Sequence, residues 1–194
     1  EDDTRAFAQR LAAHPQLVCE LILTDQLVDL AEDRIDMALR MTRSPPQDAV
    51  ARRIAAIERG IVAAPGYLAA RGTPVGVHEL ARHQTLSYLL TDEHRWRLLD
   101  ETGAEHVLSA TSRLRLNSTD CLLDAALAGH GLAILPHYLT APHVAAGRLR
   151  PVLPALQPVT PHGNVLYACY TPSRMRSPKV RVLLDALRAL FEPV

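Results

Sequence analysis

The clearest alternation of apolar and polar positions lies in residues 113–136, which read RLRLNSTDCLLDAALAGHGLAILP. Leu114 and Leu116 alternate with arginines, which is typical of a half-buried strand. The polar run at 117–120 follows at once, and its side chains can accept hydrogen bonds from free backbone N–H groups. Such a run predicts the start of a helix.

The helix that follows is apolar around most of its girth, so we expect it to be buried along most of residues 121–128. Gly129 then ends the helix, because glycine readily adopts the conformation that closes a helix C-terminus. The apolar run at 132–135 precedes Pro136 and predicts a buried strand. A polar turn between a strand and a helix N-terminus is suited to a small anionic or polar ligand.

The same periodicities predict further elements along the chain. Strands are expected at 17–23, 37–41, 85–90, 96–98 and 165–170, with an extended region within 50–64. Helices are expected at 4–13, after Asp25, around Leu80, near 142–146 and from Pro178 behind a Ser177 cap. Alternating strands and helices indicate an α/β fold, and the first strand–helix–strand segment predicts parallel pairing.

The composition limits the size of the fold, the make-up of its core and the kinds of partner. The 194 residues suffice for one domain or two small lobes, and 48% are apolar but only 4% aromatic, so the core is expected to consist mainly of aliphatic side chains. Lys plus Arg and Asp plus Glu are 21 each, which argues against this chain itself being a nucleic-acid-binding surface. We find no run of 18 apolar residues, no membrane span and no signal peptide.

Three cysteines, Cys19, Cys121 and Cys169, lie in apolar runs and are expected to be buried. An odd number of scattered cysteines favours the reducing cytoplasm over a disulfide framework.

Motifs for catalysis or metal binding fail on their spacing. His78 and His83 are five residues apart, whereas the zinc-protease motif needs four. The run at 129–131 lacks the third glycine of a dinucleotide loop and ends a helix. No serine lies in a G-x-S-x-G motif. We therefore predict no catalytic residues, no metal and no cofactor.

Motifs on both sides of the central stretch carry a family resemblance. Upstream lie VDLAEDRIDMALR and AAPGYLAARGTP, and downstream lie GRLRPVLP and SPKVRVLLDAL. In this order, and together with NSTD and AALAGHGLAILP, they resemble the effector-binding domain of LysR-type transcriptional regulators along nearly the whole chain.

The resemblance implies a fold of the type 2 periplasmic-binding-protein kind, with two α/β lobes joined by two crossover strands. Lobe I would be residues 1–61 plus 170–194, and lobe II residues 62–169. The crossings would lie near 61–64 and 168–171.

Ligand-binding residues are expected in the polar turns that follow strands, and the resemblance points to the same places. The candidates are Thr24, Arg40, Thr42, Asn117, Ser118, Thr119 and His137, with Tyr138 as a further one. The alternative for each is structural: Thr24, Asp25 and Asn117 would cap helices, and Arg40 would pair with Asp36 or another carboxylate.

The resulting hypothesis is an effector-sensing and oligomerisation domain of a LysR-type regulator in the cytoplasm, binding a small molecule between two lobes. Its expected partners are the small-molecule effector and further copies of itself, as a dimer of this domain or a tetramer of the full-length protein. DNA would be bound only by a winged helix-turn-helix that lies outside this chain. The resemblance also implies a first strand and a ligand-contacting loop before the first helix, which we expect to be either truncated or disordered here. The alternatives are a periplasmic solute-binding protein of a transporter and an enzyme on the same fold.

Overall fold

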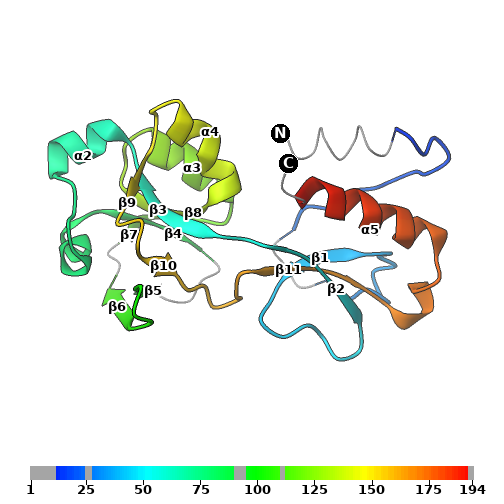
Figure 1. Ribbon diagram of the computed structural model, residues 1–194. Helices are drawn as coiled ribbons and strands as arrows, with labels where there is room; N and C mark the ends of the chain where they lie inside the picture. The colour runs from blue at the N-terminus through cyan, green and yellow to red at the C-terminus, as the bar shows by residue number, and fades with distance from the viewer. Residues whose placement is uncertain (1–11, 25–27, 90–94, 110–111, 192–194) are drawn as a thin grey trace. The chain divides into compact units, whose positions relative to one another are not determined.

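The computed structural model describes residues 12–24, 28–89, 95–109 and 112–191. The chain forms two compact units, Glu1–Ala56 with His162–Val194 (unit 1) and Ile57–Pro161 (unit 2) (Figure 1). The chain therefore passes between units at residues 56–57 and 161–162, whereas the sequence placed the crossings near 61–64 and 168–171. The identification of these units with lobes I and II stays a prediction.

Unit 1 is built on an antiparallel sheet of β1 (Ala38–Met41), β11 (Val165–Tyr170) and β2 (Val50–Ala56), in that order. The short helix η2 (Pro172–Arg174) leads to α5 (Pro178–Phe191), which contacts β2. Val180, Ala186 and Leu187 are the buried residues of α5. The strand at 165–170 and the helix starting at Pro178 are thus confirmed.

The first strand–helix–strand segment does not form as expected. Residues 17–23 have no regular structure, and Val18 and Leu23 are 87% and 86% exposed. Within the described residues no strand pairs with this segment. A strand conformation would therefore neither form inter-strand hydrogen bonds nor bury its apolar side chains. β1 instead pairs antiparallel with β11. The expected helices at 4–13 and directly after Asp25 fall wholly or partly outside the described residues, and residues 30–34 form turns.

Unit 2 contains a five-stranded sheet, ordered β7-β4-β8-β3-β9. Its strands are β3 (Arg59–Ala63), β4 (Thr85–Tyr88), β7 (Ser112–Leu116), β8 (Leu132–Pro136) and β9 (Arg150–Val152). β4 runs parallel to both of its neighbours, while β3 is antiparallel to β8 and β9. A second sheet orders β10 (Gln157–Pro158), β5 (Arg95–Leu99) and β6 (Glu105–Ser109).

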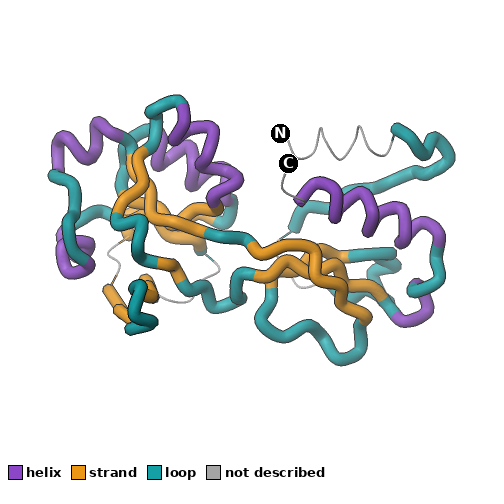
Figure 2. The backbone as a smooth tube through the Cα atoms, viewed as in Figure 1, coloured by secondary structure: helices purple, strands orange, loops and turns teal. Residues whose placement is uncertain are grey.

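Two apolar cores cover the two faces of the five-stranded sheet, because neighbouring side chains of a strand point to opposite faces. Ile61 and Leu132 belong to the core that holds α2 (Pro65–Arg71) and the 3-10 helix η1 (Val77–Arg82). Val62 and Ala133 belong to the core that holds α3 (Thr119–Leu127) and α4 (His137–Ala145), which pack on the other face (Figure 2). The central stretch therefore forms strand, helix and strand, as predicted.

The helix expected near residues 142–146 begins earlier, at His137. Pro136 has extended backbone and is the N-cap, and the buried Thr140 hydroxyl donates to the Pro136 carbonyl over 3.2 Å. Pro142 lies inside the helix, which ends at Ala145.

The cysteine expectation was right only for Cys169, which is buried, whereas Cys19 and Cys121 are exposed. Cys121 lies on the solvent side of α3, and Cys19 lies in the uncovered segment 17–23. An apolar neighbourhood in sequence does not bury a side chain when the helix turns it outward. Among the described residues, no helix has the length and apolarity that crossing a membrane requires.

Gly131 is the position where we expect a single methyl group to be most costly. A Cβ there would lie 2.6 Å from the Gln84 carbonyl oxygen, which is fixed because it accepts from the Leu132 N–H over 2.9 Å. We expect Gly131→Ala to lower the free energy of unfolding by about 3 kcal/mol, the upper end for overpacking. Gly147→Ala is the control: its φ of +70° is strained, but a Cβ meets no atom within 4 Å, so about 1 kcal/mol is expected. Equal losses in urea unfolding would contradict the steric explanation.

Candidate functional site

Four of the seven candidate ligand residues lie at one edge of the unit 2 sheet. The parallel strands β4, β7 and β8 all end there, and Asn117–Thr119 follow β7 while His137 follows β8. β4 separates these two strands, so their ends are about 10 Å apart. The carboxyl edge of parallel strands is where open α/β sheets bind ligands. We refer to this region as the carboxyl edge.

Ser118 is the N-cap of α3. Its backbone is extended (φ −120°, ψ 127°), and its hydroxyl oxygen accepts from the Cys121 N–H over 3.3 Å. The Ser118 carbonyl accepts the Leu122 N–H over 3.1 Å. The N–H groups of Thr119 and Asp120 come before the helical pattern and point out of its end. The Asp120 carboxylate in the same turn adds negative charge beside them.

His137 is the first residue of α4, and it is anchored to the start of β3. Its N–H donates to the Glu58 carbonyl over 2.9 Å, and its Nδ1 lies 3.6 Å from Glu58 Oε2. The ring lies over Gly60, where a Cβ would come within 2.7 Å of Nε2. A glycine at position 60 therefore leaves the space that the imidazole occupies. Both side chains are largely exposed, so this side-chain contact itself contributes little stability.

Sequence reasoning missed Glu58, Arg59 and Gly60, which belong to the same edge because Arg59 pairs with Pro136. Arg59 is half-buried, and burial lowers the pKa of its guanidinium, with the nearby Tyr138 acting in the opposite direction. An arginine stays protonated despite such a shift. The sequence could have pointed to these three residues only as two charged residues and a glycine between two apolar runs.

The other three candidates belong to unit 1. Thr42 closes a local turn: its hydroxyl donates to the Ser44 carbonyl over 2.9 Å and accepts from the Ser44 N–H over 3.1 Å. Arg40 donates to the Val28 carbonyl. Of the carboxylates offered as its structural partner, Asp36 is not the one, and it lies 3.2 Å from Arg174 Nε instead. Backbone N–H groups of Glu32 and Ala31 lower the pKa of the Asp29 carboxyl, and the charge of Arg40 lowers it further. Thr24 is exposed in a segment without regular structure.

The structure therefore shows structural contacts of Arg40 and Thr42, and the ligand roles of all three residues stay predictions. Within the described ranges, no group of three His, Cys, Asp or Glu side chains is placed to hold a metal ion.

Comparison with known proteins decides the family. The family model described as "LysR substrate binding domain" matches residues 4–192. The chain belongs to the LysR substrate-binding domain family. PgrR of Escherichia coli, an HTH-type transcriptional regulator, is 33% identical over 161 residues, which are 81% of this chain and 54% of PgrR. PtxR of Pseudomonas aeruginosa, also an HTH-type transcriptional regulator, is 30% identical over 90% of this chain and 55% of its own length.

Solved structures agree with this assignment. The regulatory domain of CrgA, a LysR-type transcriptional regulator from Neisseria meningitidis, superposes with a TM-score of 0.81 at 25% identity, covering 97% of this chain and 91% of that domain. The expected fold, of the type 2 periplasmic-binding-protein kind, is therefore confirmed. The chain spans about half the length of the curated relatives it matches.

Removing the Ser118 cap tests its structural role. We expect Ser118→Ala to lower the free energy of unfolding by about 1 kcal/mol, because the Cys121 N–H loses its acceptor. Ser118→Asp keeps an acceptor at the N-cap and should retain nearly all of the stability. Chemical denaturation of both variants measures the difference. Equal stabilities of the alanine and aspartate variants would show that the cap contributes nothing.

Proposed function

We propose that this chain is the effector-sensing and oligomerisation domain of a LysR-type DNA-binding transcriptional regulator. The observation that carries the proposal is the family match over residues 4–192, together with relatives that are named transcriptional regulators. The transporter alternative is not favoured, because these relatives are regulators and not solute-binding proteins. We further propose that the domain is not an enzyme and that it acts in the cytoplasm.

The carboxyl edge supports binding of a small polar molecule. The first turn of α3 offers outward N–H groups, Ser118 and Thr119 offer hydroxyls, and His137 offers an imidazole held above Gly60. Arg59 adds a half-buried positive charge at the start of β3. Such a set can bind a ligand with both acceptor and donor groups. That the ligand is held between two lobes stays a prediction.

Regulation requires the effector to favour one arrangement of the protein over another. A ligand that binds two arrangements equally shifts nothing, however tightly it binds. We propose that effector binding changes the arrangement of subunits in a homodimer of this domain, or in a tetramer of the full-length protein. DNA would be contacted by a helix-turn-helix module in the rest of a longer chain, as the names of the relatives suggest.

Two threonine variants test the effector site. A ligand found by thermal-shift screening of small metabolites should bind Thr119→Ala and Thr42→Ala about fivefold more weakly than wild type. This is the effect of losing one neutral hydrogen bond of about 1 kcal/mol. The melting temperature of Thr119→Ala should change little, and that of Thr42→Ala should fall only slightly, because the two hydrogen bonds to Ser44 that it loses are exposed to solvent. Calorimetric titration measures the affinities, and Thr73→Ala, at an exposed loop position, is the control. Unchanged affinity in both variants would place the site elsewhere.

The exposed apolar segment 17–23 supports self-association. Its Leu21 and Ile22 side chains are 57% and 66% exposed. A contiguous exposed apolar segment of this kind marks an interaction surface. We expect the domain to sediment as a dimer at tens of micromolar, roughly the range for a moderate interface. Ile22→Asp should shift it to monomer, because a charge would be buried. Val75→Asp, at an isolated exposed valine of unit 2, should not. A wild-type monomer would contradict the proposal.

A further inference from the structure

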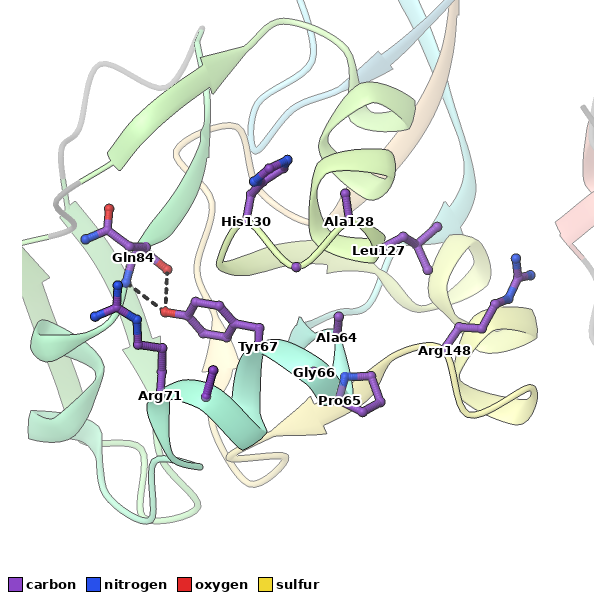
Figure 3. A pocket seen from close by; sticks show the side chains of 12 residues that line it. Ala64, Pro65, Gly66, Tyr67, Arg71, Gln84, Leu127, Ala128, His130 and Arg148 are labelled. Atoms are coloured by element: carbon purple, nitrogen blue, oxygen red, sulfur yellow. Dashed lines mark hydrogen bonds between the residues drawn. The ribbon is translucent and has the colours of Figure 1, made fainter.

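Unit 2 has a pocket of about 670 Å³ between α2 and the end of α3 (Figure 3). It lies at the opposite end of α3 from Ser118, and none of the seven candidate ligand residues lines it. Its volume is within the range of small-molecule sites. The pocket is therefore separate from the carboxyl edge.

One wall of the pocket is the tightly closed end of α3. The His130 N–H donates to the Ala125 carbonyl over 3.1 Å, and the Gly129 N–H to the Ala126 carbonyl over 3.0 Å. Gly129 has φ +79°, so these contacts form a Schellman motif. The motif engages two of the last helix carbonyls, which reduces the negative charge that the helix end presents to the pocket.

The facing wall is held by Tyr67 of α2. Its buried hydroxyl accepts from the Gln84 N–H over 2.9 Å and lies 3.2 Å from His83 Nδ1 (Figure 3 draws the Gln84 contact). Burial lowers the pKa of His83, with Glu79 raising it and Arg71 lowering it further. The neutral imidazole can therefore accept from Tyr67. With both walls fixed, the pocket is preformed, and a ligand would spend little free energy on ordering it.

The lining combines an apolar surface with positive charge. Ala64, Pro65, Leu127 and Ala128 supply apolar area. Arg71 and Arg148 supply positive charge, His130 supplies an imidazole, and none of the lining residues is acidic (Figure 3). In the described part of the chain, neither arginine forms an ion pair with a carboxylate. Arginine is suited to binding carboxylates through its fork of N–H donors.

We propose that this pocket is a second ligand site of the domain, which binds a small organic carboxylate with an apolar body. A guanidinium of Arg71 or Arg148 holds the carboxylate, and the aliphatic part lies on Leu127 and the Tyr67 ring. The site is independent of the proposed effector site, because it is built from the opposite end of α3 and from α2.

Hexanoate is the probe, and 1-hexanol and acetate are its comparisons. Hexanoate should shift the amide resonances of Tyr67, Arg71, Gly129 and His130 in the 194-residue chain. Hexanol lacks the charge and acetate lacks the apolar body, so each should bind about tenfold more weakly than hexanoate. Shifts confined to Asn117–Thr119 and His137 would overturn the proposal, as would equal binding of hexanol.

Variants of the lining residues distinguish binding in the pocket from nonspecific binding of hexanoate. Arg71→Gln combined with Arg148→Gln should weaken hexanoate at least about tenfold, the usual effect of removing a charged hydrogen-bond partner. Arg150→Gln is the matched control, because Arg150 is a neighbouring exposed arginine outside the lining, and it should bind like wild type. Gly66→Leu should abolish binding by filling the pocket, since an added Cβ at Gly66 meets no atom within 4 Å. Wild-type affinity in the double variant would refute the site.

Discussion

The close approach of the Gly131 backbone to the Gln84 carbonyl organises unit 2. The Leu132 N–H donates to that carbonyl, and this hydrogen bond leads into the pairing of β8 with β4 at Thr85 and Leu132. Only a residue without a Cβ can approach a backbone oxygen this closely. The contact sets the register of two parallel strands, and a register shift of one residue would exchange the two faces of the sheet.

Both proposed ligand sites depend on this register. At the carboxyl ends, it brings the turn after β7 and the start of α4 to the same edge as β3. At the other end, Gln84 holds the Tyr67 hydroxyl, and the end of α3 lies opposite. A single helix, α3, therefore contributes a capped N-terminus to one site and a closed C-terminus to the other. Because α3 is packed through Leu122, Leu123 and Ala126, its two ends are held with respect to the sheet.

The two sites have different chemistry for a physical reason. The start of α3 presents donors, with Asp120 limiting how much negative charge a ligand can carry there. The end of α3 would repel an anion, but its carbonyls are partly engaged and arginines from α2 and the β9 approach line the pocket. We therefore infer that the carboxyl edge binds a polar effector and that the pocket binds a carboxylate with an apolar body.

Local signals in the sequence determined much of this protein. Alternation and the NSTD run were sufficient for β7, α3 and β8, because a strand period, a cap and a closing glycine each act over a few residues. Local signals also predicted that Asn117–Thr119 and His137 directly follow strands, as the structure has them, while their ligand roles stay predictions. They failed where a partner distant in sequence decides the outcome. Residues 17–23 have a strand-like composition, but a strand needs a neighbour to pair with. The tertiary structure alone placed Arg59 and Gly60 beside His137 and closed the pocket between α2 and α3, because antiparallel pairing and helix packing join residues that the sequence separates by tens of positions.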